Sequence, residues 1–148
     1  MFSPKRIILH HSATEDSGTV SWLAIRDYHI RVKEWSDIGY HFGIERIMDD
    51  YGRSGIEILF GRLLTEAGAH AYGYNHDSIG ICFVGNYDVV IPNIGMLKHG
   101  VRLVNWLRQV YSIPISSIIG HRDVSDKTCP GKLFDIKMFQ NMVRVGEV

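Results

Sequence analysis

The chain has 148 residues, of which 45% are hydrophobic and 22% are charged, so it has the composition of a globular domain and not of a disordered segment. Its 16 Lys and Arg residues balance its 16 Asp and Glu residues, and the whole chain therefore lacks the basic charge of a nucleic-acid-binding or anionic-membrane-binding protein. The two cysteines are too few for a disulfide framework, and we expect Cys82, inside the apolar run 79–84, to be a core residue.

The N-terminus lacks the apolar segment of a signal peptide, and no later run approaches the length of a transmembrane helix. We therefore expect a single domain over residues 1–148 that stays in the cytoplasm of the producing cell. We also expect a monomer with no stable membrane association and no nucleic-acid partner.

In chain order, the first elements are a strand and a helix. The apolar run 6–9 predicts a buried strand that ends in the histidine pair at 10–11. Thr19 or Ser21 then caps a helix that we expect to reach about residue 33.

The middle of the chain predicts a hairpin, a loop and a buried strand. Alternating side chains favour a strand over 40–48, turn residues fill 49–55, and 56–59 is the returning strand. The glycine- and histidine-rich stretch 61–77 is typical of a surface loop, and the apolar run 78–85 predicts a strand covered on both faces.

The last third predicts two helices around one more strand. Asn93 caps a helix over 95–111, residues 115–119 form a strand, and Asp135 caps a final helix that ends near 145. Strands that alternate with helices indicate an α/β domain, with a mixed central sheet of about five to six strands flanked by three main helices.

Two histidines follow apolar strands at points where α/β proteins build their sites. The histidine pair at 10–11 ends the first strand, and His121 directly follows the run 115–119. If the two strands are neighbours, these histidines share one rim of the sheet. With Cys129 they make three protein ligands, the number that leaves a fourth zinc position open for water in catalytic sites. Side-chain alternation does not show whether His10 or His11 faces the metal.

Other histidines have plainer interpretations. His29 lies on the apolar face of its helix with Trp22, Ile25 and Val32, and we expect it to be packed there. We expect His76 on the loop surface and His99 facing solvent. A structural zinc domain, with His41 or His70 closing the site as a fourth ligand, is an alternative to a catalytic one.

Five motifs, taken together, cover nearly the whole chain: Ile-Leu-His-His-Ser-Ala-Thr at 8–14, Asp-Ile-Gly-Tyr-His-Phe at 37–42, Gly-Ala-His-Ala at 68–71, Asn75 with Ser-Ile-Gly-Ile at 78–81, and Gly-His-Arg-Asp at 120–123 with Lys-Thr-Cys-Pro-Gly at 127–131. In this order they resemble the type 2 N-acetylmuramoyl-L-alanine amidases. That family includes bacteriophage lysozyme-type amidases and the peptidoglycan recognition proteins.

The resemblance implies a zinc hydrolase with one metal ion, whose substrate is peptidoglycan. Such enzymes cut the amide bond between N-acetylmuramic acid and the L-alanine of the stem peptide. By position in the motifs, His10, His121 and Cys129 correspond to the metal ligands. Tyr40 and Lys127 correspond to residues with catalytic roles, and the positions that match the substrate groove are His41, His70 and Asn75.

Elementary chemistry is consistent with these roles. A zinc ion bound by two imidazoles and one thiolate lowers the pKa of its bound water from about 16 toward 7. Lys127 would stabilise the developing oxyanion, and Tyr40 would orient water or carry a proton. The stretch from His121 to Cys129 is about one residue shorter than in many members of the family, which bears on where Lys127 points.

A binding module without activity is the main alternative, because some peptidoglycan recognition proteins hold muropeptides without cutting them. The presence of Cys129 favours the hydrolase. Together with the missing signal peptide, the resemblance predicts a phage or prophage endolysin that reaches the cell wall only after release.

Overall fold

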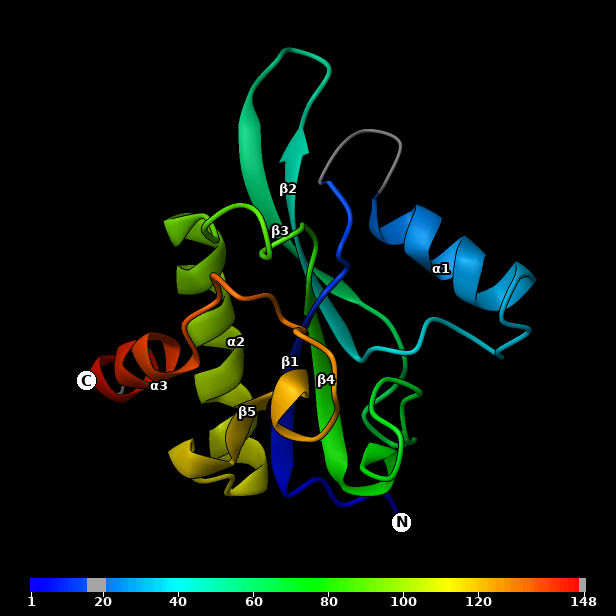
Figure 1. Cartoon of the computed structure of the whole chain (residues 1–148), viewed down its shortest axis with the longest axis vertical. Coiled ribbons are helices and arrows are strands. Elements are labelled where there is room, and N and C mark those ends of the chain that lie inside the picture. The colour runs from blue at the N-terminus through cyan, green and yellow to red at the C-terminus, as the bar shows by residue number, and fades with distance from the viewer. Residues whose placement is uncertain (16–20, 147–148) are drawn as a thin grey trace.

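The computed structural model describes residues 1–15 and 21–146, which form a sheet with helices on both faces (Figure 1). The strands are β1 (Arg6–His11), β2 (Phe42–Met48), β3 (Ser54–Phe60), β4 (Ser78–Phe83) and β5 (Ile118–Gly120). The helices are α1 (Trp22–Arg31), α2 (Ile94–Tyr111) and α3 (Ile136–Val145). Short 3-10 turns cover Asn75–Asp77, Ile115–Ser117 and His121–Asp123.

The five strands form one mixed sheet in the order β3-β2-β4-β1-β5. The hairpin strands β2 and β3 are antiparallel, whereas β4 runs parallel to both β2 and β1, and β5 runs parallel to β1. The predicted α/β class, the hairpin and the three helices are therefore confirmed.

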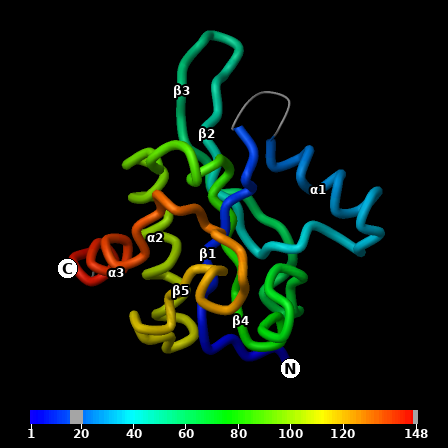
Figure 2. The backbone as a smooth tube through the Cα atoms, in the orientation of Figure 1, coloured from blue at the N-terminus to red at the C-terminus, as the bar shows by residue number. Residues whose placement is uncertain are grey.

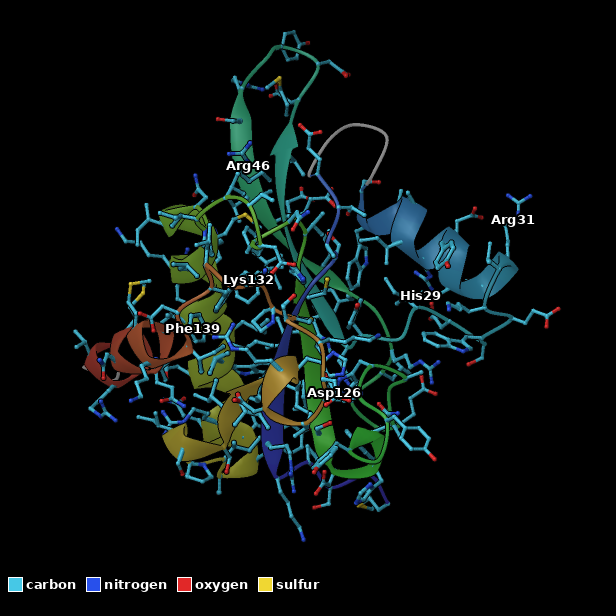
Figure 3. The ribbon with its side chains drawn as sticks, viewed as in Figure 1. His29, Arg31, Arg46, Asp126, Lys132 and Phe139 are labelled. Atoms are coloured by element: carbon cyan, nitrogen blue, oxygen red, sulfur yellow. The ribbon has the colours of Figure 1, made fainter. Side chains whose placement is uncertain are left out.

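Helices α2 and α3 cover one face of the sheet (Figure 1). The predicted caps are present: Asn93 accepts from the N–H groups of Gly95 and Met96, and Asp135 accepts from that of Met138. Phe139 points from α3 into the core (Figure 3), where its ring centroid lies 6.0 Å from that of Phe83. This side supplies most of the hydrophobic core.

Helix α1 covers only part of the opposite face, where a glycine of the sheet leaves space for an aromatic side chain of the helix. Trp22, the buried residue of α1, lies over Gly43, where a Cβ would come within 2.4 Å of the indole. Cys82, which pairs with Gly43 in register, is fully buried on this face, as predicted. The tube in Figure 2 shows that the loop after β5 runs close to β1, apart from α1. The end of β1 therefore remains available for a site.

Several predicted boundaries are wrong at their ends. The run 115–119 divides into a 3-10 turn and a shorter strand, because Pro114 and the two serines at 116–117 favour a turn before the chain enters the sheet. The first helix ends at Arg31, and Val32 is exposed instead of lying on an apolar face. Ser21 stands at its N-cap position without a side-chain hydrogen bond, and Thr19 lies outside the described residues.

The second strand also begins later than predicted, at Phe42, because Tyr40 and His41 belong to the segment that leads into β2. Cys82 and Cys129 are both free thiols. None of the described helices combines the length and the apolar character needed to cross a membrane.

Candidate active site

His10 and His121 meet at one rim of the sheet because β1 and β5 are parallel neighbours. Leu9 pairs with Gly120, so the residues that follow each of them emerge side by side. The centroids of the two imidazole rings lie 4.6 Å apart. The expected juxtaposition of two strand-end histidines is therefore present.

The layers of the fold decide which histidine of the pair faces the site. Leu9 packs on the face covered by α2 and α3, and side chains alternate along a strand, so His10 lies on the open face. His11 lies on the other side, where it stacks on Tyr87 and its Nδ1 accepts from the Tyr87 N–H at 3.1 Å.

Cys129 is brought to these histidines by a tightly held loop. The Arg122 N–H donates to the Cys129 carbonyl at 2.6 Å, and the Arg122 guanidinium donates to the carbonyls of Gly131 and Phe134. The backbone N–H of His11 donates to the Cys129 sulfur at 3.4 Å. The loop is thus fixed by its own backbone and by the strand that carries His10.

The three side chains have the chemistry and spacing of a zinc site. One ligand atom from each of His10, His121 and Cys129 lies within 4.8 Å of the others. Cys129 Sγ lies 3.6 Å from His10 Nδ1, and two such ligands on one tetrahedral zinc ion would stand about 3.6 Å apart, given bonds of about 2.3 and 2.05 Å. The residues present therefore fit the ion.

Burial sets the protonation of two of these ligands. It lowers the pKa of His10 well below its usual range, and the neighbouring His70 and His121 lower it further, so the ring is neutral as a metal ligand must be. Burial also raises the pKa of the Cys129 thiol to about 11, although the His11 N–H and the charge of Lys127 oppose this shift.

A cleft of about 630 Å³ opens over the ligands. The segment 29–40 supplies one wall with His29, Lys33, Trp35 and Tyr40, and the opposite wall carries Asp88, Lys127 and Thr128. In Figure 3, His29 lies between α1 and the segment that leads to β2, and Asp126 marks the loop that carries Lys127. The cleft therefore separates two stretches that are far apart in the sequence.

Tyr40 and Lys127 both lie at this cleft. The Tyr40 ring centroid is 5.1 Å from that of His10, and burial, followed by the nearby Cys82 and Cys129, raises the pKa of Tyr40 well above its usual range. Lys127 is exposed, and the pKa of His121 is lowered first by burial and then by the positive charge of Lys127. Both groups thus line the same cleft as the three candidate ligands.

The three predicted substrate residues are placed differently from one another. His41 is fully buried, with Nδ1 accepting from the Gly80 N–H and Nε2 facing the Glu66 carbonyl. Asn75 accepts from the N–H groups of His70 and Ala71. Only His70 reaches the cleft, and it is 9% exposed. The structure therefore gives His41 and Asn75 contacts within the protein, away from the groove.

Neither histidine that could have closed the site as a fourth ligand belongs to the metal cluster found among the described residues. His70 Nδ1 contacts His10 Nε2, the nitrogen opposite the one that faces Cys129. The geometry therefore favours a site with an open position.

Sequence reasoning assigned no role to several residues of the cleft, among them Lys33, Trp35, Asp88 and Thr128. Asp88 accepts from the Thr128 hydroxyl and the Lys132 N–H, both at 2.9 Å, and so connects the segment after β4 to the loop that carries Cys129. The position of Asp88 soon after the end of β4 could have indicated a site residue from the sequence. Trp35 and Lys33 carried no such signal, because they follow a helix whose orientation only the fold sets.

Comparison with known proteins assigns the chain to a family. The family model described as N-acetylmuramoyl-L-alanine amidase matches residues 2–132. The chain belongs to this amidase family. The match begins before β1 and extends beyond Cys129, so it includes every residue assigned above to the ligand cluster and the cleft.

Two curated relatives, a phage endolysin and a peptidoglycan-recognition protein, are similar to this chain. The endolysin of Enterobacteria phage T3 is 36% identical over 137 residues, which cover 88% of this chain and 82% of the endolysin. Peptidoglycan-recognition protein LB of Drosophila melanogaster is 35% identical over 133 residues, covering 84% of this chain. The matched region is only 53% of the Drosophila protein, so the chain spans about half the length of that relative.

Solved amidase structures share the fold. The N-acetylmuramoyl-L-alanine amidase LysC from Clostridium intestinale URNW superposes with a TM-score of 0.81 at 27% identity, covering 97% of this chain and 87% of LysC. A mutant of Drosophila PGRP-LB in complex with tracheal cytotoxin superposes with a TM-score of 0.74 at 29% identity, covering 93% and 81% of the two chains.

Proposed function

We propose that this chain is a zinc-dependent hydrolase that cleaves the amide bond between N-acetylmuramic acid and L-alanine in peptidoglycan. The observation that carries the proposal is the cluster of His10, His121 and Cys129 at the floor of an open cleft, in a chain of the amidase family. The complex of the PGRP-LB mutant with tracheal cytotoxin supports a muropeptide as the ligand class.

His10, His121 and Cys129 would hold the ion, which supplies Lewis acidity and water activation when bound. Lys127 places a positive charge at the cleft, where it stabilises negative charge that develops on the scissile carbonyl oxygen. The raised pKa of Tyr40 keeps its phenol protonated at neutral pH, so Tyr40 donates a hydrogen bond to the reacting groups instead of acting as a base.

The second candidate is a muropeptide-binding module without activity, with which the similarity to peptidoglycan-recognition protein LB is compatible. Both functions require the cleft, but only the hydrolase requires turnover. The similarity to the T3 endolysin supports the hydrolase and an endolysin role, in which the protein acts on the cell wall after release.

Purified peptidoglycan, incubated with the protein and one equivalent of zinc, tests the proposal. We expect new L-alanine amino termini on released stem peptides and free lactyl carboxylates on N-acetylmuramic acid, measured by end-group labelling and mass spectrometry. Chelation of the metal should stop their release, and added zinc should restore it. Retention of muropeptides without new amino termini would establish the binding module instead.

A further inference from the structure

The ring of His70 contacts His10, a predicted metal ligand, at the ring nitrogen of His10 that faces away from Cys129. His10 Nε2 lies 2.8 Å from His70 Nδ1 in a buried contact, and the two rings are nearly perpendicular at 88°. His10 Nδ1 points the other way, toward Cys129 Sγ at 3.6 Å. The two nitrogens of His10 therefore have separate partners, one on the metal side and one on the His70 side.

A chain of hydrogen bonds beyond His70 determines which nitrogens carry protons. The Ser78 hydroxyl donates to the Tyr74 carbonyl at 2.6 Å, so its oxygen is left to accept. His70 Nε2 lies 3.3 Å from this hydroxyl oxygen and 3.5 Å from the Ser78 carbonyl, both of which are acceptors. His70 Nε2 therefore carries the ring proton, and His70 Nδ1 is an acceptor.

The same logic extends to His10. Because His70 Nδ1 accepts, the hydrogen bond between the two rings requires a proton on His10 Nε2. A neutral imidazole with a proton on Nε2 has its lone pair on Nδ1. His10 thus presents a bare Nδ1 to the side where Cys129 and His121 lie.

The position of His70 is itself tightly fixed. A Cβ on Gly80 would come within 2.5 Å of His70 Cγ, and a Cβ on Gly68 within 2.6 Å of His70 Cδ2. The His70 ring therefore lies in a slot that only glycine permits on either side. Asn75 holds the backbone at this point by accepting from the His70 N–H at 2.8 Å.

We propose that His70 is a positioning residue that fixes the ring orientation and the tautomer of His10, so that Nδ1 is ready to bind the metal. The proposal rests on the zinc hydrolase proposed above and assigns to His70, Asn75, Ser78 and the two glycines a role in building the metal site. Hydrogen-bond partners behind metal-bound histidines raise the basicity of the ligand and set its orientation.

Nuclear magnetic resonance on the metal-free protein tests the tautomer without zinc or substrate. Two-bond proton–nitrogen correlations of the histidine rings distinguish a protonated Nε2 from a protonated Nδ1. We expect His10 with its proton on Nε2 in the wild type and a mixture of both tautomers in His70→Leu. A wild-type His10 with its proton on Nδ1 would overturn the proposal.

A matched pair of variants tests the consequence for metal binding. His70→Leu removes the acceptor at similar size, whereas His70→Asn places a carbonyl oxygen near the position of Nδ1. In competition with a chromophoric chelator, we expect His70→Leu to bind zinc about 10- to 100-fold more weakly and His70→Asn to recover most of the affinity. Equal affinity of His70→Leu and wild type contradicts the proposal, as does equal weakening by both variants, which indicates a packing role.

Circular dichroism and thermal unfolding of the metal-free variants show whether they fold. If His70→Leu does not fold, Gly80→Ala displaces the ring of His70 while retaining every titratable group, and the same loss of zinc affinity is expected.

Failure of the proposed function gives a different result. If the wild-type protein binds zinc but releases no L-alanine amino termini, the hydrolase proposal is wrong, and the zinc affinities of the His70 variants still test the role of His70. If wild type binds no zinc, the proposed function and the metal-positioning role of His70 both fail, and the tautomer spectra show only whether His70 orients His10.

Discussion

Cys129 Sγ lies 3.6 Å from His10 Nδ1, although 119 positions separate the two residues in the chain. The contact depends on the parallel pairing of β1 with β5 and on the loop that Arg122 anchors to the carbonyls of Cys129, Gly131 and Phe134. It closes a ligand set of the type that zinc prefers, and most of the expected chemistry depends on it.

Cys129 and Cys82 are both free thiols, but only Cys129 belongs to the proposed ligand cluster. Cys129→Ala should weaken zinc binding by more than about a hundredfold and abolish hydrolysis, because removal of a metal ligand weakens binding more than removal of a hydrogen-bond partner of a ligand does. Cys82→Ala, at a buried position of β4, is the control and should keep the metal. Zinc titration with a competing chelator measures both, and tight binding by Cys129→Ala would remove Cys129 from the ligand set.

The charge of Lys127 should matter for turnover and not for metal binding. Lys127→Ala removes a cation at the cleft, and we expect hydrolysis of peptidoglycan to slow about 100- to 1,000-fold with zinc affinity retained. Lys132→Ala is the matched control in the same loop (Figure 3), since its backbone N–H to Asp88 survives the change. A Lys127 variant as fast as the control would show that the oxyanion is stabilised by other groups.

The substitution Tyr40→Phe removes the hydroxyl of Tyr40 and keeps its ring. The ring packs against His10, His29 and Trp22, so Tyr40→Phe should fold and bind zinc as the wild type does. Loss of the phenolic proton donor should slow hydrolysis about 100- to 10,000-fold. The exposed Tyr28→Phe serves as the control, and initial rates on purified peptidoglycan compare the two. Unchanged rates in Tyr40→Phe would limit Tyr40 to packing.

Acid should destabilise the fold through His41. Burial lowers the pKa of His41 from 6.5, and its Nδ1 is occupied by the Gly80 N–H. Below about pH 6.5 the unfolded chain therefore binds more protons than the folded chain, and the free energy of unfolding falls as the pH falls; above this value the contribution is fully present.

Urea unfolding of the metal-free protein between pH 8 and pH 5 measures this slope. His41→Gln should make the slope shallower than in the wild type. Phe2→Leu, which alters the ring stacked on His41 without removing a titratable group, should lower stability but retain the slope. The same slope in His41→Gln and wild type would mean that other groups cause the acid sensitivity.

The cap of α3 should contribute to stability independently of the site. Asp135 accepts from the Met138 N–H at 2.9 Å, and Asp135→Ala should lower the free energy of unfolding by about 1 kcal/mol. Asp135→Asn keeps a capping oxygen and should remain within a few tenths of a kcal/mol of the wild type. Urea denaturation compares the variants, and equal stability of the two would show that the cap contributes little.

The sequence by itself determined the secondary-structure order and two of the candidate ligands, His121 and Cys129. Apolar runs and caps such as Asn93 and Asp135 are local signals, and they predicted the elements to within a few residues. His121 and Cys129 were predictable because they lie in one short motif after a strand, where α/β proteins place their sites.

Only the tertiary structure decided what each histidine faces. His10 and His11 are adjacent in sequence, and their roles differ because α2 and α3 cover one face of the sheet whereas α1 leaves part of the other open. His41 and Asn75 belong to motifs of the family, yet packing directs them to backbone groups. The contact of His70 with His10 joins residues 60 positions apart through a slot between two glycines, which no local pattern encodes.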